Sequence, residues 1–331
     1  MKSRVVTTTL VVTTTFAVHF LATTTALALD AGLPAYQPVK GISGELKSVG
    51  SDTLDQAMEL WAQGFRERYP NVKLEIEGKG SATAPATLTD GASQFGPVSR
   101  PMTGAGLEAF EKKYGYKVLS FRVAVDALAV YVNKENPIEC LTMEQVDRIF
   151  SSTRKGSGGR SIDTWGQAGL SGDWSAKRIS FYGRNTISGT YEFFRQTALY
   201  EGGYKPEVKL QVGSNAIVEA VAGEKFSIGY SSIGYRTDGV RAVPLSVFSG
   251  AKCYDTSAES VLAGKYPLAR YLYIYVNKKP GEPLDALRAE FIKYILSKDG
   301  QTETENSGYY PITEEIRKAE LENLGLSPAV K

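Results

Sequence analysis

Short apolar runs rich in β-branched and aromatic residues alternate with stretches of helical periodicity along the chain. The clearest helical stretch runs from Leu54 to Tyr69, with an apolar side chain at every third or fourth position, and a proline ends it. Further helices are predicted over Met143–Phe150 and Asp285–Leu296 and directly after Ser188. The predicted strands are Glu45–Val49, Val72–Glu77, Ala127–Val132, Arg178–Tyr182, Lys209–Val212, Phe226–Tyr230 and Tyr271–Val276. This alternation predicts the α/β fold class.

Two distant segments share one pattern. Residues 127–133 and 271–277 are each a strand-like run that ends in Asn before a Lys. We expect them to be neighbours in one sheet, which would bring the two ends of the chain together around a middle domain. Between them, Thr153–Trp174 is rich in Gly, Ser and Asp, and we expect a surface loop there.

The first 28 residues have the pattern of a secretory signal peptide. Lys2 and Arg4 give a positive start, Val5–Leu27 is uncharged, and Ala26-Leu27-Ala28 is a small-x-small cleavage site. A membrane span is the alternative, but the apolar runs are short and interrupted by threonines. No cysteine stands near the cleavage site, which argues against a lipid anchor. We therefore expect an exported chain that begins at Leu29.

The size and charge of the mature chain limit its fold and its partners. Removal of 28 of the 331 residues leaves 303, which fits two domains. The apolar and charged fractions, 42% and 22%, are those of a globular protein. Without Lys2 and Arg4 the formal charge falls from +2 to 0. A neutral chain argues against nucleic acid or an anionic membrane as the main partner, so any anion must be bound by local groups.

Histidine and cysteine usage narrows the chemistry further. The one histidine, His19, lies in the predicted signal, so the mature chain has no Ser-His or Cys-His dyad. Carboxylate or lysine chemistry stays open. Cys140 and Cys253 either form one disulfide, as export permits, or remain two buried thiols. Two cysteines without histidine are too few to hold zinc, and we expect neither a metal nor a cofactor.

Three segments place small or hydroxyl residues between a predicted strand and a helix start. They are Gly50-Ser-Asp-Thr53, Gly78-Lys-Gly-Ser-Ala-Thr83 and Ile187-Ser-Gly-Thr190. The first N–H groups of a helix have no partner within the helix and attract anions. Each segment alone is more often explained by N-capping. Together, at strand ends, they indicate a site for a tetrahedral oxyanion. The lysine segment lacks the Walker spacing, so an NTPase is not indicated.

Two arginines and two carboxylates are candidates to complete that site. Arg184, four residues before Ser188, can make a bidentate contact to the same anion, and Arg100 lies in another loop; for both, a surface ion pair is the alternative. Phosphate keeps a proton at neutral pH and sulfate does not, so a carboxylate that accepts this proton selects phosphate. Asp52 can take that role if its loop lines the site, and is otherwise a helix N-cap; Asp126 is the second acidic candidate.

At these residues the chain resembles the periplasmic phosphate-binding component of phosphate ABC transporters, the PstS family. The matching segments are Ser48–Leu54, Gly80–Pro85, Ser99–Met102, Val123–Ala129, Asn136–Ile138, Phe181–Tyr191, Ile228–Tyr235 and Tyr266–Arg270. The most specific element is Arg-x-x-x-Ser-Gly-Thr, from Arg184 to Thr190. The resemblance covers essentially the whole mature chain.

The resemblance implies a type II periplasmic-binding-protein fold, with two α/β domains joined by hinge strands and a ligand cleft between them. Domain 1 would comprise residues 29–133 and 244–331, and domain 2 residues 134–243. The family's phosphate ligands fall on Thr53, Leu54 (through its N–H), Ser81, Arg184, Ser188, Gly189 and Thr190. Ser51 and Asp52 join them by their position in the same loop.

The chain departs from the family pattern at two positions. Where some members carry a proton-accepting Asp after a Ser, this chain has Ser99-Arg100. We therefore hypothesise that Asp52 accepts the phosphate proton and that Arg100 adds positive charge. Ala82 stands where a second hydroxyl is common, which removes one donor.

The function implied by the resemblance is high-affinity binding of inorganic phosphate in the periplasm and its delivery to the permease of an ABC transporter. The protein would act as a monomer, with no catalytic residues and no nucleic acid partner. Three alternatives stay open: a secreted phosphatase, although metal phosphatases use histidine ligands that the mature chain lacks; a binder of sulfate or molybdate; and an extracellular adhesion or scavenging role on the same fold.

Overall fold

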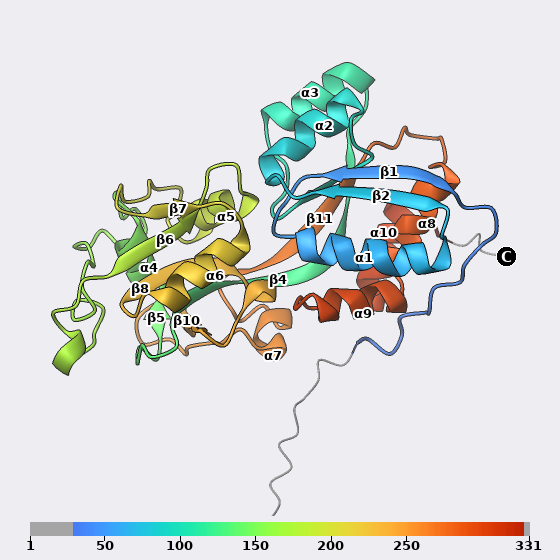
Figure 1. Ribbon diagram of the computed structural model, residues 1–331. Helices are drawn as coiled ribbons and strands as arrows, with labels where there is room; N and C mark the ends of the chain where they lie inside the picture. The colour runs from blue at the N-terminus through green and yellow to red at the C-terminus, as the bar shows by residue number, and fades with distance from the viewer. Residues whose placement is uncertain (1–28, 328–331) are drawn as a thin grey trace, which may run out of the picture.

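A computed structural model describes residues 29–327, so the predicted signal segment lies outside the described residues. Within this range, the chain forms two α/β lobes that lie side by side and share the strands between them (Figure 1). The expected α/β class with two lobes is confirmed. No helix within residues 29–327 has both the length and the apolar composition needed to cross a membrane.

The first lobe contains both ends of the described chain. Its sheet begins with β2 (Val72–Glu77), β1 (Gly44–Val49) and β3 (Phe95–Val98), which are parallel. Its helices are α1 (Asp55–Arg68), α2 (Ala84–Asp90), α3 (Ala105–Tyr114), α8 (Ala286–Ile295), α9 (Lys298–Asn306) and α10 (Glu314–Asn323). In Figure 1, α2 and α3 project as a pair beyond the sheet, on the side away from α9.

The second lobe is formed by the middle of the chain. Its parallel strands are β7 (Lys209–Gln211), β6 (Ser180–Arg184) and β8 (Ser227–Ser232), with β9 (Val240–Ala242) at one side. Two short strands, β5 (Leu141–Thr142) and β10 (Leu245–Ser246), pair separately. The helices are α4 (Met143–Phe150), α5 (Gly189–Thr197), α6 (Ser214–Gly223) and α7 (Ala258–Leu262), with one-turn 3₁₀ helices at Ser81–Thr83 in the first lobe and at Gly172–Trp174 and Ile233–Tyr235.

Two long strands connect the lobes. β4 (Leu119–Asn133) pairs antiparallel with β11 (Ala269–Val276) along its first half and with β8 along its second half. The whole sheet therefore has the order β2-β1-β3-β11-β4-β8-β6-β7. The strands that contain the two similar segments are neighbours, but the segments themselves do not pair: residues 271–276 lie opposite residues 119–125, whereas residues 128–133 pair with β8 and β9.

Burial explains where the strongest elements form. On α1, Met58, Trp61 and Phe65 are fully buried and face the core of the first lobe. The Trp61 indole N–H donates to the carbonyl of Gly300 at 2.8 Å, which fixes α1 against α9. Burial of aromatic side chains of this size contributes the largest share of packing free energy per residue, so α1 is a firm support for the loop before it.

Several predicted boundaries are corrected by the structure. The strand predicted at Arg178–Tyr182 is β6 and ends at Arg184, so this arginine is the last residue of a strand and not part of a loop. The strand predicted at Phe226–Tyr230 continues to Ser232. β3 was not predicted, because its sequence Phe-Gly-Pro-Val contains two residues that usually break strands.

The segment expected to be a surface loop is only partly one. Residues 153–174 carry little regular structure, but the side chains of Ile162 and Trp165 are fully buried. The Trp165 indole N–H donates to the carbonyl of Phe226 at 3.0 Å. The glycine and serine content correctly predicted an irregular backbone. It did not predict that two isolated apolar side chains anchor this segment to the second lobe.

A disulfide links the two passages of the chain between the lobes. Cys140, just before β5, is bonded to Cys253, 113 residues later. The pairing of β5 with β10 lies beside this disulfide. The segment after residue 244 therefore contacts residues near 141 before the chain enters β11. The division into residues 29–133 with 244–331 and residues 134–243 stays a prediction.

Candidate functional site

The predicted oxyanion segments meet between the lobes. The β1–α1 connection and the 3₁₀ turn at Ser81 come from the first lobe, and the β6–α5 connection comes from the second. Parallel strands present their carboxyl ends at one edge of a sheet, and each lobe turns this edge toward the other. Three contacts, described in turn below, join residues that lie more than 100 positions apart in the chain.

Arg184 and Asp52 form an ion pair between the lobes. The Arg184 side chain is fully buried, and its Nη2 donates to Asp52 Oδ2. Its Nη1 donates to Ser214 Oγ at 2.7 Å, at the start of α6. Arg184 Nε and Asp52 Oδ1 are both buried and have no hydrogen-bond partner among the described residues. The pair thus retains one free donor and one free acceptor, which is costly in a buried site that stays empty.

Two threonines form the second contact. Thr53 Oγ1 and Thr190 Oγ1 lie 3.0 Å apart, and both residues are fully buried. Thr53 belongs to the first lobe and Thr190 to the first turn of α5 in the second. Each hydroxyl can donate one hydrogen and accept two, so the two can turn from each other to a ligand between them.

Gly189 and Ser81 form the third contact. A Cβ atom built on Gly189 would lie 2.4 Å from Ser81 Oγ, so only glycine allows α5 to approach the first lobe this closely. The backbone of the two loops is also joined, since the Ala82 N–H donates to the Ile187 carbonyl at 3.1 Å. The N–H groups of Gly189 and Ser81 have no acceptor among the described residues, so both remain available to an anion.

Other predicted ligands have capping contacts in this structure. Ser188 Oγ accepts the Thr190 N–H at 3.1 Å and caps α5, and Ser51 Oγ accepts the Thr53 N–H at 3.2 Å. The Leu54 N–H, predicted to bind the ligand, donates to the Ser51 carbonyl at 3.2 Å. A hydroxyl oxygen that accepts a cap hydrogen bond still has its own hydrogen to donate, so capping and ligand binding are compatible for the two serines.

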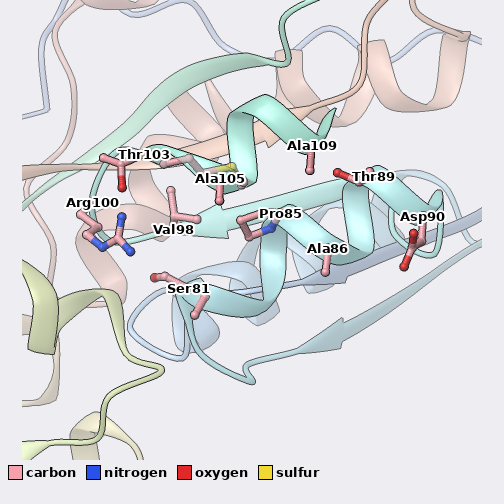
Figure 2. A pocket seen from close by; sticks show the side chains of 13 residues that line it. Ser81, Pro85, Ala86, Thr89, Asp90, Val98, Arg100, Thr103, Ala105 and Ala109 are labelled. Atoms are coloured by element: carbon pink, nitrogen blue, oxygen red, sulfur yellow. The ribbon is translucent and has the colours of Figure 1, made fainter. Parts of the chain in front are cut away.

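Arg100 lies apart from the three contacts. Its Nη1 donates to the adjacent Pro101 carbonyl, and its side chain lines a groove of about 510 Å³ between α2 and α3. Figure 2 shows Arg100 and Ser81 at one end of this groove and Asp90 at the other. Hydrogen bonds from Arg195 lower the pKa of Glu192 on α5, and the charge of Arg100 adds to this effect. Arg100 therefore faces α5 at the edge of the site.

The sequence prediction omitted Arg270, which the structure joins to the site. Arg270 Nη2 donates to Thr190 Oγ1 at 2.9 Å, and Nε donates to Asp126 Oδ2 at 2.9 Å. Asp126 is fully buried and also accepts from Ser232 Oγ at 2.6 Å. Arg270 lies in Tyr266–Arg270, one of the segments that resemble the PstS family, and this was the one indication of its role. It was omitted because no helix start or glycine lies next to it.

A tyrosine supports the loop that carries Asp52. The Tyr235 hydroxyl donates to the backbone carbonyl of Asp52 at 2.8 Å. Burial, together with the carboxylates of Asp55 and Asp52, raises the pKa of Tyr235 well above its usual value. Burial, with Glu59 and Asp52 nearby, also raises the pKa of Asp55. Tyr235 therefore stays protonated and keeps its donor role at neutral pH.

No cluster of three or more metal-ligating side chains occurs in residues 29–327. The groups that converge between the lobes are N–H groups, hydroxyls and guanidinium groups, together with the Asp52 carboxylate, which can only accept. This set of groups suits an oxyanion that carries a proton.

Comparison with known proteins places the chain in a family. A model of the PBP superfamily domain matches residues 35–299. The phosphate-binding protein PstS of Pseudomonas aeruginosa is 47% identical over 305 residues, which cover 92% of this chain and 94% of the relative. PstS of Staphylococcus haemolyticus is 28% identical over 289 residues, or 86% of each chain.

Solved structures show the same fold. A Clostridium perfringens protein with bound phosphate matches with a TM-score of 0.67 at 24% identity, covering 82% of this chain and all of its own. An ABC-type phosphate transport receptor from Vibrio cholerae matches with a TM-score of 0.61 at 22% identity, covering 81% of this chain and all of its own. With most of its length matched by the family model and by the Pseudomonas aeruginosa relative, the chain belongs to the PBP superfamily and, within it, to the PstS family of phosphate-binding proteins.

Proposed function

We propose that this protein binds one inorganic phosphate ion between its lobes and delivers it to the permease of an ABC transporter. The observation that carries the proposal is the buried ion pair with an unused donor, Arg184 Nε, and an unused acceptor, Asp52 Oδ1. Phosphate that carries one proton supplies an acceptor for the first and a donor for the second. The PstS relatives, which are named for phosphate binding, support the choice of this anion.

The proposed ligands come from both lobes. They are Ser51, Asp52, Thr53, Leu54, Ser81 and Arg100 from the first lobe, and Arg184, Ser188, Gly189 and Thr190 from the second. Charge-assisted hydrogen bonds contribute about 1.5–3 kcal/mol each, so several together give a Kd on the order of micromolar or tighter after the costs of association. Ligand contacts on both sides favour the closed arrangement of the lobes over an open one.

Selectivity against sulfate follows from the carboxylate. Sulfate has no proton at neutral pH, so Asp52 Oδ1 would face an oxygen that cannot donate to it. Two unpaired negative groups in a buried site repel each other, and this penalty rejects sulfate without any change of shape. Arg100, at the edge of the site, adds attraction for anions that approach the cleft.

The proposal extends to location and partners. The protein is exported after cleavage of the signal near Ala28, acts in the periplasm as a monomer, and needs a membrane permease as its partner. We assign no catalytic residue. The mature sequence has no histidine, so the imidazole base of the commonest hydrolase sites has no counterpart in it.

Calorimetric titration of the purified mature protein tests the proposal. After removal of bound ligand, phosphate should bind with a stoichiometry near one, whereas sulfate at the same concentration should give no heat of binding. Arg184→Ala should abolish phosphate binding. Arg178→Ala, which removes an exposed arginine just before the same strand, should leave it unchanged. Binding of sulfate as tight as that of phosphate would contradict the proposal. Hydrolysis of a phosphate ester that depends on Arg184 would contradict it as well.

A further inference from the structure

Arg270 holds a position that neither the oxyanion segments nor the proposed ligand set explains. It lies on β11, directly opposite Asp126 on β4, so the two residues link the strands that join the lobes. Arg270 Nε and Nη2 lie 2.9 and 2.8 Å from Asp126 Oδ2, and both side chains are buried. The carboxylate balances the positive charge of Arg270, so this arginine adds little net attraction for an anion.

The same guanidinium also contacts α5 of the second lobe. Arg270 Nη2 donates to Thr190 Oγ1 at 2.9 Å, and the Arg270 Cζ atom lies 5.1 Å from the centre of the Phe193 ring. Arg270 Nη1 is buried and has no partner among the described residues. The side chain therefore has more donors than its ion pair needs, and one of them is directed to a predicted phosphate ligand.

The direction of this hydrogen bond constrains the Thr190 hydroxyl. Arginine can only donate, so Thr190 Oγ1 must accept from Arg270. A cation next to the oxygen repels the hydroxyl hydrogen, which then lies on the side away from Arg270. The other partner of Thr190 Oγ1 among the described residues is Thr53 Oγ1, 3.0 Å away across the cleft. The hydroxyl hydrogen of Thr190 thus points toward Thr53 on the opposite lobe.

We infer that Arg270 is a positioning residue that holds the Thr190 hydroxyl as a donor to the bound anion. The inference rests on the proposed phosphate site. In the complex, the Thr190 hydrogen turns from Thr53 to a ligand oxygen while Arg270 keeps its bond to Thr190 Oγ1. An unprotonated oxygen is the stronger acceptor for the Thr190 hydroxyl, which favours the orientation with the protonated oxygen at Asp52. Arg270 therefore helps to set the orientation of phosphate without touching it.

A double-mutant cycle on the full mature chain tests this inference. Phosphate Kd is measured by calorimetry for the unmodified protein, Arg270→Lys, Thr190→Val and the combination. Lysine keeps the charge opposite Asp126 but not the guanidinium fork. Arg270→Lys alone should weaken phosphate binding roughly tenfold, the size of one lost hydrogen bond. In the Thr190→Val background the same change should cost less than about twofold, because the hydroxyl that it acts on is gone.

Two further variants separate positioning from support of the fold. Thr190→Ser keeps a hydroxyl, so the full loss on Arg270→Lys should return in that background. Arg122→Lys is the matched control, since Arg122 lies on β4, the partner strand of β11, and also pairs with a carboxylate, Glu320, but makes no hydrogen bond with Thr190 among the described residues. It should leave the phosphate Kd unchanged. If Arg270→Lys does not fold, Asp126→Asn with Arg270→Gln replaces it, because this neutral pair removes the cation without leaving a buried charge.

The outcomes are distinct. Equal losses from Arg270→Lys in the Thr190 and Thr190→Val backgrounds would overturn the inference and leave Arg270 a structural link between the strands. No loss in either background would overturn it as well. If the unmodified protein binds no phosphate in the same titration, the proposed function itself fails, and this result is visible before any variant is compared.

Discussion

At the scale of single residues, the site is defined by what its side chains leave unused. A buried guanidinium normally satisfies every N–H, yet Arg184 Nε has no partner among the described residues, and the carboxylate beside it has a free oxygen. Leaving two buried polar atoms unpaired costs on the order of 1–3 kcal/mol each. A protonated oxyanion that hydrogen-bonds to both atoms removes this cost. The free energy gained in this way favours a ligand that offers both an acceptor and a donor.

Asp52→Asn should therefore change the selectivity between phosphate and sulfate. The amide can donate a hydrogen where the carboxylate could only accept, so phosphate should bind roughly tenfold or more weakly while sulfate binding becomes measurable. Competition of the two anions, followed by calorimetry, gives the ratio. Asp90→Asn, an exposed carboxylate at the end of α2, is the control and should change neither affinity. Unchanged phosphate affinity and selectivity in Asp52→Asn would refute the proton-acceptor role.

At the scale of elements, the first turn of α5 is the component that must fit against the opposite lobe. Ser188 caps this helix, Gly189 lies against Ser81, and Thr190 contacts Thr53. The free N–H of Gly189 and the partial positive charge of the helix start both point at the cleft. The backbone of α5 must therefore lie close to the first lobe for the site to form. At a greater distance, the N–H groups of the helix could not reach an anion bound to the first lobe.

Gly189→Ala should impair binding through this contact. Its Cβ would meet Ser81 Oγ at 2.4 Å and Ser99 Oγ at 2.6 Å, so the lobes could not close fully. We expect phosphate affinity to fall at least roughly tenfold, since the hydrogen bonds made on closure are lost together. Gly223→Ala, at the end of α6 with nothing within 4 Å of an added Cβ, should bind phosphate like the unmodified protein. Tight binding by Gly189→Ala would show that closure does not need this approach.

The sequence predicted those elements whose signals are local. The face from Leu54 to Tyr69 and the three helix starts identified α1 and the loops of the site, because periodicity and capping are read from neighbouring residues. β3 was missed because Gly96 and Pro97 conceal a strand that is held by burial between other strands. Arg270 was missed for a related reason, since only the pairing of β11 with β4 brings it to Thr190.

At the scale of the whole molecule, β4 and β11 couple the lobes and the aromatic core fixes each lobe. Because β4 pairs with β11 in one half and with β8 in the other, a bend along it changes the cleft without breaking either lobe. The cores around these strands bury many tyrosine hydroxyls. Burial raises the pKa above the usual value at Tyr36, Tyr131, Tyr204, Tyr230, Tyr235, Tyr266, Tyr309 and Tyr310.

These tyrosines predict a steep loss of stability at alkaline pH. Their pKa is higher in the folded protein than in the unfolded chain, where it is about 10. Above that pH the unfolded state loses protons that the folded state keeps, so the free energy of unfolding falls as pH rises. Urea unfolding from about pH 8 to 11 should show a falling midpoint, with tyrosinate absorbance appearing only as the protein unfolds. A constant midpoint over this range would contradict the burial of these hydroxyls.

Donors from the two lobes are proposed to converge on a single protonated phosphate. A crystal structure of the phosphate-loaded protein tests this convergence most directly. We expect one ion within hydrogen-bond distance of Thr53 and the Ser81 turn on one side, of Arg184 Nε and the first turn of α5 on the other, and of Asp52 Oδ1. A phosphate held by one lobe alone, or an Arg184–Asp52 pair that points away from the ion, would contradict the account.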